Sequence, residues 1–210
     1  MECSNMDFYV SNAFFSTLFI LAIVLPIYFI RQRRKYKTIP DERSCFTKIS
    51  SILLIVYVSA LIAVLVFPYW MFELYPSLGV FDFHFVISTE REVNLIPFKT
   101  LIEQITAAVK QEFATNYELS FFNILINLGM FAPMPILLKL VNKKISLPMG
   151  VLVSFVFSLV CEFLQYFVGR SSDIDDLILN TLGSGIGCGV YLIGEKAVKK
   201  HMDKKKAKAS

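Results

Sequence analysis

The sequence predicts an all-α membrane protein with about five transmembrane helices and an interfacial amphipathic helix in a long outer loop. Three observations lead to this fold class. Hydrophobic residues make up 55% of the 210 residues. They gather in five runs, and a run of about 18 or more apolar residues is long enough to cross a bilayer. Lysine and arginine concentrate in alternate loops between those runs, as they do in multi-span proteins.

The five apolar runs account for most of the chain. Four contain no charged residue, and the other contains only Glu162. The charge-free runs are residues 8–30, 49–72, 119–138 and 177–194, and the run with Glu162 is 147–168. The longest segment outside them is 73–118, so we expect no separate soluble domain. The chain then divides into two N-terminal spans with a basic loop (1–72), an outer loop with three spans (73–194) and a basic tail (195–210).

The charged residues orient these spans. Seven basic residues lie in 31–48, three in 139–144 and seven after Gly194, whereas the opposite side receives four basic and twelve acidic residues. Basic loops stay in the cytoplasm, so we expect the N-terminus outside and the C-terminus inside. The acidic start of the chain does not fit a signal peptide. The net charge of +4 is thus a topology signal and not a sign of nucleic-acid binding. The tail is expected to be solvated or to contact anionic headgroups.

The outer loop has two predicted elements. Residues 81–86 alternate apolar and polar side chains, which indicates a short strand or an interfacial segment. From residue 98 to 113, apolar residues recur at helical spacing, and Pro97 suits a first helical position. Two interpretations of this amphipathic helix remain open. It lies in the outer headgroup layer, or it is a lid packed on the helical bundle.

Polar residues inside the last three spans form the candidate site. Ionisable groups within a membrane are costly and usually mark function. Counting 1.5 Å per residue along each helix places them at a similar depth near the outer leaflet. The set comprises Asn123 and Asn127 in the third span, Glu162 and Gln165 in the fourth, Arg170, Asp173, Asp175 and Asp176 in the following loop, and Asn180 in the fifth.

Three further sequence features affect how that site is interpreted. Asparagines in membrane helices often serve as interhelical glue, which is the alternative for Asn123 and Asn127. The small-residue repeat of residues 183–189 predicts close helix packing. Pro133 and Pro135 are expected to break or kink the third span.

Four sequence blocks resemble the VanZ-like membrane protein family. They are Arg91-x-x-Asn94-Leu-Ile-Pro-Phe98, then Asn123-x-x-x-Asn127-x-x-x-Phe131-x-Pro133, then Glu162-x-x-Gln165, then Gly169-Arg-x-x-Asp173-x-Asp175-Asp176-x-x-x-Asn180-Thr-x-Gly183. The blocks run from about residue 91 to 189, roughly half the chain, in the family's order. One departure is Pro135, where the family usually has glycine. The resemblance implies a Gram-positive cell membrane protein, in a family whose founding member is associated with low-level resistance to teicoplanin, a lipoglycopeptide.

The site and the resemblance together lead to one main hypothesis about function. The protein binds or acts on an amphipathic molecule, either a lipid-linked cell-envelope precursor or a lipidated glycopeptide, in a polar cleft beneath the helix of residues 98–113. Arg91 and Arg170 would hold an anionic head group, because guanidinium pairs bidentately with phosphate or carboxylate. The acidic residues and the amides, Asn94 included, would contact sugar, amide or amine groups.

Two alternatives stay open. In the first, the protein is an enzyme that acts on a lipid-linked head group. Glu162 would then be its catalytic acid or base, and Asp173, Asp175 and Asp176 would be candidates for binding a divalent metal. In the second, it is an accessory subunit of an envelope assembly, with residues 183–189 as the docking face for a membrane protein or a second copy. The ligand, the reaction and the oligomeric state stay undetermined at this level.

Overall fold

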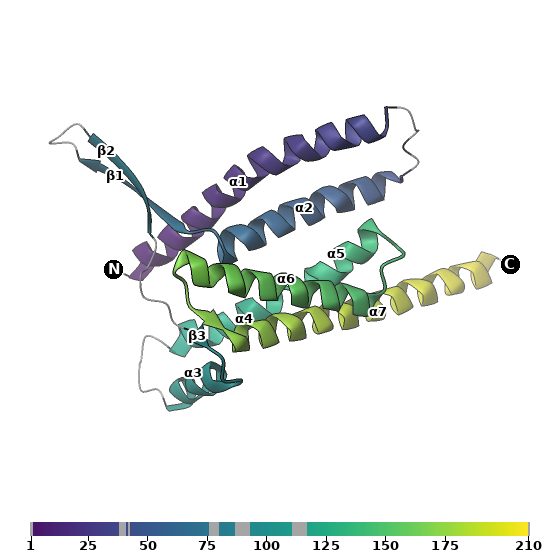
Figure 1. Ribbon diagram of the computed structural model, residues 1–210. Coiled ribbons are helices and arrows are strands. Elements are labelled where there is room, and N and C mark those ends of the chain that lie inside the picture. Colours follow the sequence, from purple (N-terminus) through teal and green to yellow (C-terminus); the bar gives the residue numbers. More distant parts are fainter. Residues whose placement is uncertain are drawn as a thin grey trace. The chain divides into compact units, whose positions relative to one another are not determined.

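A computed structural model describes residues 2–37, 41, 43–75, 80–86, 93–110 and 117–209. Five of its helical segments are long and apolar enough to cross a membrane: Val10–Lys35, Cys45–Leu65, Ile124–Val141, Leu147–Val168 and Ile174–Lys205. The predicted all-α membrane fold is confirmed. In chain order the elements are α1 (Glu2–Lys35), α2 (Cys45–Leu65), β1 (Tyr69–Tyr75), β2 (Val80–Val86), β3 (Val93–Asn94), α3 (Lys99–Lys110), α4 (Tyr117–Met130), α5 (Pro133–Val141), α6 (Leu147–Val168), β4 (Ser172–Asp173) and α7 (Ile174–Ala209) (Figure 1).

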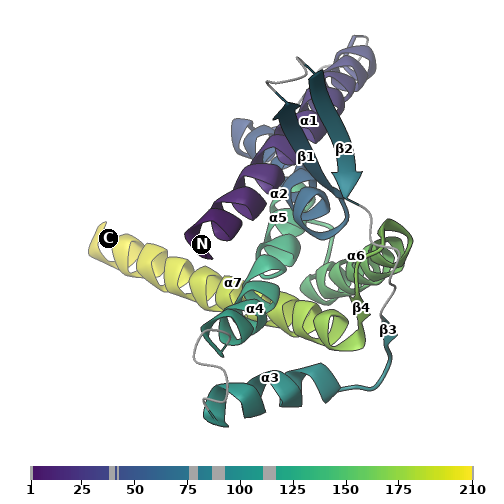
Figure 2. The ribbon, with the colours of Figure 1, turned by 90° about the vertical axis from the view of Figure 1, so that its left-hand side faces the viewer.

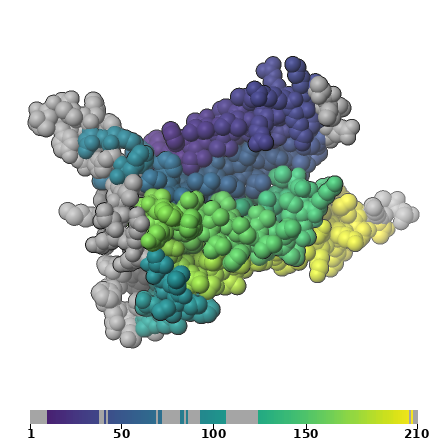
Figure 3. Space-filling view, viewed as in Figure 1, coloured from purple at the N-terminus to yellow at the C-terminus, as the bar shows by residue number. Residues whose placement is uncertain are grey.

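The chain divides into two compact units. Unit 1 comprises Met1–Asn94 and Val160–Ser172, and unit 2 comprises Leu95–Leu159 and Asp173–Ser210. In unit 1, α1 and α2 lie side by side (Figure 3). Large apolar side chains are exposed on α1, among them Phe14, Phe15, Leu18, Phe19 and Ile23. An apolar surface of this kind marks a membrane-facing helix.

The second span is shorter than its charge-free run. The run extends to residue 72, but α2 ends at Leu65 and β1 begins at Tyr69. Pro68 explains the difference, because a proline disfavours helical geometry at the residue before it. The aromatic residues that follow also favour a strand over a helix. At 21 residues, α2 still spans roughly 30 Å, about the thickness of the hydrocarbon core.

Strands β1 and β2 form an antiparallel hairpin that projects from the helices of unit 1 (Figure 1). The predicted strand at residues 81–86 is therefore present, and its partner was not foreseen. Trp70 pairs with Phe85 across the hairpin. The Phe83 ring centroid lies 5.9 Å from that of Trp70 and 5.4 Å from that of Phe85. The Trp70–Phe83 pair joins the two strands, and aromatic pairs across strands add to the stability of a hairpin.

Unit 2 is built on a close approach of α7 to the α4–α5 segment (Figure 2). A Cβ added to Gly183 would lie 2.0 Å from the Leu128 carbonyl oxygen, and one on Gly187 would lie 1.9 Å from that of Ala132. Only glycine fits at either position. The predicted role in close helix packing is confirmed for Gly183 and Gly187, which face the chain's own backbone. A Cβ on Gly185 or Gly189 would meet no described atom within 4 Å.

The third span is broken where the two prolines predict. Helix α4 ends at Met130, and α5 begins at Pro133. The first N–H groups of a helix have no intrahelical acceptor, so Pro133 and Pro135 in the first turn of α5 remove no helical hydrogen bond. The Ser184 hydroxyl donates to the Phe131 carbonyl at 3.4 Å. The same hydroxyl has a shorter contact, 3.0 Å, with the Asn180 carbonyl of its own helix, and the Phe131 carbonyl also accepts the Met134 amide at 3.2 Å.

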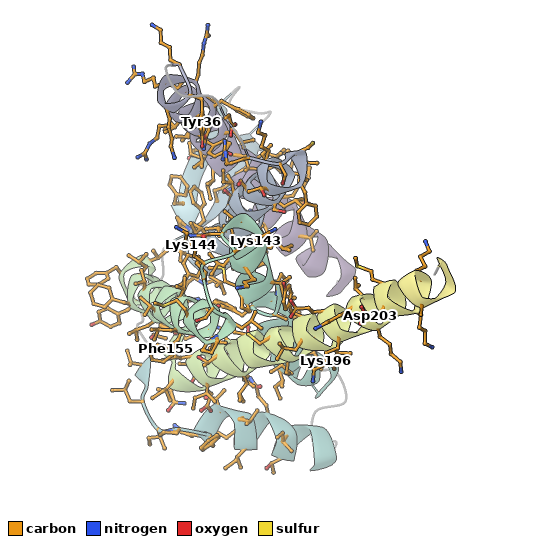
Figure 4. All side chains as sticks on the ribbon, turned by 90° about the vertical axis from the view of Figure 1, so that its right-hand side faces the viewer. Tyr36, Lys143, Lys144, Phe155, Lys196 and Asp203 are labelled. Carbon is orange, nitrogen blue, oxygen red and sulfur yellow. The ribbon has the colours of Figure 1, made fainter. Side chains whose placement is uncertain are left out.

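Helix α3 is the predicted amphipathic helix, with a different start. It begins at Lys99, and Phe98 adopts a positive φ of 66°. Pro97 is therefore a turn residue and not the first helical residue. Residues 111–116, which include the predicted end at 113, lie outside the described residues. The final helix, α7, continues through the predicted tail to Ala209, and Lys196 and Asp203 are exposed along it (Figure 4).

Candidate functional site

The fourth span ends in a glycine motif that positions two candidate residues. Gly169 has a φ of 76°, the left-handed geometry that ends many helices. The Arg170 amide donates to the Gln165 carbonyl at 3.0 Å, which is the long hydrogen bond of a Schellman motif. That motif brings the side chains of these two positions together. An apolar contact is common there, but this chain has Gln165 and Arg170.

Both side chains reach the carboxyl end of α2. Gln165 Nε2 donates to the Leu65 carbonyl at 2.9 Å, and Arg170 Nη1 donates to the Val64 carbonyl at 2.7 Å. The last carbonyls of a helix lack intrahelical donors. They also carry the negative end of the helix dipole, which a guanidinium stabilises. Gln165 and Arg170 are therefore C-terminal caps of α2, which sequence reasoning missed although Gly169 was a signal for the motif.

One buried polar atom of this cluster lacks a hydrogen-bond partner among the described residues. Gln165 is 5% exposed, and among the described residues no donor meets its Oε1 atom. Glu162 precedes it by three positions on the same helix face and is 7% exposed. An unpaired buried acceptor is uncommon in native proteins and requires an explanation. The fourth span thus presents a carboxylate and an unused amide oxygen one helical turn apart.

The three aspartates predicted to lie in a loop are placed at the start of α7, with Asp173 just before it and Asp175 and Asp176 in its first turn. Asp173 Oδ1 accepts the Asp175 amide at 2.9 Å, as an N-cap of α7 does. The two oxygens of Asp175 accept the amides of Phe98 at 2.5 Å and Leu101 at 3.0 Å. Asp175, which is 3% exposed, therefore caps the amino end of α3. A carboxylate also suits the positive end of that helix dipole.

Asn127 and Asn180 also form hydrogen bonds to other protein groups. Asn127 Nδ2 donates to Asp176 Oδ1 at 2.5 Å, and Asn180 Nδ2 donates to the Ser158 hydroxyl at 2.9 Å. Both pairs join helices within unit 2, as the glue interpretation of Asn127 expects. Asn180 is 2% exposed, and its Oδ1 atom has no partner in the described part of the chain. Ser158 is a partner that sequence reasoning did not identify.

The geometry does not favour the metal interpretation. Within the described ranges, no group of three His, Cys, Asp or Glu side chains is placed to hold an ion. Asp173, Asp175 and Asp176 each accept a separate hydrogen bond from the protein. They do not present oxygens toward one point, as a cation with several carboxylate ligands requires.

The structure places the remaining candidates as follows. Asn94 lies in β3, which pairs with β4. Arg91 lies outside the described residues, and so does the side chain of Asn123.

Sequence reasoning missed a second polar contact, in unit 1. Asn12 Nδ2 donates to the Trp70 carbonyl at 2.8 Å, and the Trp70 amide donates to Asn12 Oδ1 at 3.1 Å. The Trp70 indole donates to Ser16 at 3.2 Å. These bonds fasten the hairpin to α1 beside an aromatic cavity of about 380 Å³, lined by Phe15, Ser16, Phe19, Phe67, Trp70, Phe83 and Phe85. The signal was the i, i+4 spacing of Asn12 and Ser16, the same spacing as Asn123 and Asn127.

Comparison with known proteins identifies the family. The family model for VanZ/LLP1 matches residues 54–195. The chain belongs to the VanZ/LLP1 family. It is 30% identical over 133 residues to the protein VanZ of Enterococcus faecium, and that match covers 63% of this chain and 66% of VanZ. No solved structure matches the chain. The family resemblance drawn from four ordered blocks is thus confirmed, and the chain is a VanZ-like membrane protein.

Proposed function

We propose that this VanZ-like protein binds the head group of an amphipathic molecule, a lipid-linked cell-envelope precursor or a lipidated glycopeptide, at the outer leaflet. In this way it would contribute to glycopeptide resistance. Glu162 and Gln165 receive hydrogen bonds from the ligand, and Arg170 supports them while it caps α2. Hydroxyl, amide and amine groups are the donors that a carboxylate and an amide oxygen accept. Sugars and peptides carry all of them.

The unpaired Oε1 atom of Gln165 is the observation that carries the proposal. Leaving a buried acceptor without a donor costs about 1–3 kcal/mol. The amide group of Gln165 is also held in place, because its Nε2 atom is bonded to Leu65. A hydrogen-bond donor of the ligand that meets Oε1 recovers that cost. The Gln165 side chain loses no further conformational freedom when this bond forms. Binding sites commonly consist of such fixed polar groups.

The aromatic cavity of unit 1 supports the amphipathic character of the ligand. Its volume, about 380 Å³, falls in the usual range for small-molecule sites of roughly 300–1,000 Å³. Six of its seven lining residues are aromatic. Such a lining suits an acyl or isoprenoid chain and offers little to a polar head group.

The experiment separates the acceptor of Gln165 from its capping role. Gln165→Lys keeps a donor for the Leu65 carbonyl but removes the acceptor, and Gln165→Glu does the reverse. Binding of a fluorescent lipoglycopeptide and retention of lipid-linked precursors are measured with the purified protein in bilayer nanodiscs. We expect Gln165→Lys to lose roughly tenfold or more in affinity, which corresponds to one lost buried hydrogen bond. Wild-type affinity in Gln165→Lys, together with an unchanged melting temperature, contradicts the proposal.

Glu162→Gln distinguishes binding from catalysis. The substitution keeps the shape and an acceptor but removes the negative charge. If Glu162 only binds the ligand, the variant should lose affinity, and the loss should be larger for a ligand with more positive charge. An acid or base catalyst should lose turnover while its affinity persists. The enzyme alternative includes a divalent metal, and adding a chelator tests for it. Under our proposal, the chelator leaves ligand binding unchanged.

The proposed orientation places the N-terminus and residue 171 outside and the C-terminus in the cytoplasm. It is tested in a cysteine-free background with single cysteines introduced at Ser171 and at Lys143. Both residues are exposed. A membrane-impermeant maleimide applied to intact cells should label position 171 and leave position 143 unmodified. The reverse pattern moves Glu162 and Gln165 to the cytoplasmic side and ends the outer-leaflet proposal.

A further inference from the structure

A second hollow lies in unit 1, between α1 and α2. Its volume is about 550 Å³, and it is lined by Val24, Ile27, Tyr28, Arg31, Gln32, Lys35 and Ile55. Six of these residues come from α1, where they recur at three- and four-residue intervals and so form one stripe along the helix. We call it the α1–α2 groove. In the proposed orientation, its basic end lies on the cytoplasmic side.

The groove changes from apolar to basic along its length. Val24, Ile27 and Ile55 are apolar, whereas Arg31 and Lys35 lie further toward the end of α1. From residue 24 to residue 35 the helix rises roughly 16 Å. This is close to the roughly 15 Å depth of one leaflet's hydrocarbon, taken as half the bilayer core. One end of the groove is therefore suited to hydrocarbon and the other to a headgroup.

Its charge is uniformly positive. No acidic residue lines the groove, and Arg31 and Lys35 form no ion pair within the described ranges. The neighbouring carboxylate, Asp41, is engaged elsewhere, because it pairs with Arg43 at 2.9 Å and Lys48 at 3.2 Å. Figure 4 labels Tyr36 at this end of α1, where nitrogen-tipped side chains spread outward. Among the described residues, the two cationic groups of the groove have no carboxylate counter-ion.

A hydrogen-bonded tie holds the basic end in shape. Arg43 Nη2 donates to Gln32 Oε1 at 2.9 Å, and the guanidinium lies 4.8 Å from the centroid of the Tyr36 ring. The same guanidinium, by hydrogen bonding, holds the pKa of Asp41 well below its usual range. The tie between α1 and the start of α2 therefore keeps its charges across neutral and mildly acidic pH. A preformed site binds with a smaller ordering cost.

We propose that the α1–α2 groove binds an anionic phospholipid. Its phosphate and headgroup pair with Arg31 and Lys35, and its first methylene groups lie along Val24, Ile27 and Ile55. Basic pockets between membrane helices bind anionic headgroups in other proteins, and the apolar floor adds a contact that free phosphate lacks. This site is separate from the outer-leaflet function proposed above and does not depend on it.

The test compares two variants of equal charge. Arg31→Gln with Lys35→Gln removes the groove's cations, whereas Arg33→Gln with Arg34→Gln removes two cations of the same helix that do not line it. The full-length protein is reconstituted with phosphatidylcholine alone or mixed with phosphatidylglycerol, and retained lipids are counted by native mass spectrometry. We expect the groove variant to lose roughly thirtyfold in phosphatidylglycerol retention, because two basic residues near a membrane surface contribute additively. The control should lose clearly less than the groove variant, because Arg33 and Arg34 do not line the groove.

A third variant tests the groove itself and guards against misfolding. Val24→Trp fills the apolar end and leaves every charge in place, so phosphatidylglycerol retention should fall while the melting temperature without that lipid is unchanged. Millimolar inorganic phosphate should not displace the lipid. Equal loss in the groove and control variants means general charge attraction and overturns the proposal. So does full retention by Val24→Trp, displacement by phosphate, or equal retention of phosphatidylcholine.

Discussion

Gln165 and Asp175 are almost equally buried, at 5% and 3% exposed, yet their hydrogen bonds differ. Both oxygens of Asp175 accept backbone amides. The amide nitrogen of Gln165 donates to a backbone carbonyl, and in the part of the chain that the structure describes its oxygen meets no donor. Burial of a polar side chain in a membrane helix is thus compatible with a structural or a ligand-binding role. The difference between Gln165 and Asp175 lies in how many of their polar atoms are satisfied, and not in their burial.

The largest expected effect is the loss of a satisfied cap. Asp175→Ala leaves the Phe98 and Leu101 amides without their acceptor and should destabilise the protein by about 2–3 kcal/mol, at the upper end for a cap because the group is buried. Thermal unfolding in detergent measures the change. Asp175→Asn is the matched control, because it keeps one acceptor and should lose less. A melting temperature equal to wild type in Asp175→Ala would show that the cap is dispensable.

A smaller effect is expected at the start of α7. Asp173→Ala removes an N-cap and should cost about 1 kcal/mol. Asp173→Ser retains a capping oxygen and should recover most of that loss. Both are compared by melting temperature in the same detergent. If serine and alanine destabilise equally, Asp173 does not act through its hydrogen bond to the Asp175 amide.

The comparison is sharpest at Gln165. Gln165→Leu loses one hydrogen bond, to Leu65, but also removes the unsatisfied acceptor, so the net change in stability should be under about 1 kcal/mol. Ligand binding should nevertheless fall. A loss of stability as large as that of Asp175→Ala would place Gln165 with the structural caps and remove the distinction between the two residues.

The smallest effect is expected at Arg170. Arg170→Lys keeps the positive charge at the carboxyl end of α2, so the favourable dipole interaction persists. The change in stability should be about 0.5 kcal/mol or less, within the usual size of charge effects at helix ends. Arg170→Gln is the comparison variant, since it removes the charge. Similar melting temperatures for both show that the contact with the Val64 carbonyl does not depend on charge.

The resemblance and the span count were predictable because they rest on local composition. Five apolar runs and four ordered blocks are visible without any knowledge of contacts. The two predictions that the structure corrects, the end of the second span and the start of α3, also concern local sequence. Pro68 shortens the second span, and Phe98 with its positive φ delays the start of α3 from Pro97 to Lys99. Both involve backbone geometry next to a proline, where hydropathy carries no information.

The sequence by itself determined where the membrane spans lie, which side chains within them are polar, and where the third span breaks. These properties follow from hydropathy and proline chemistry within a few residues. Only the tertiary structure decided which polar atoms are satisfied. The partners are distant in the chain, since Gln165 meets Leu65 across 100 positions and Asp175 meets Phe98 across 77. A helix end exposes the same unpaired groups whatever its sequence, so the side chain that caps it is set by packing.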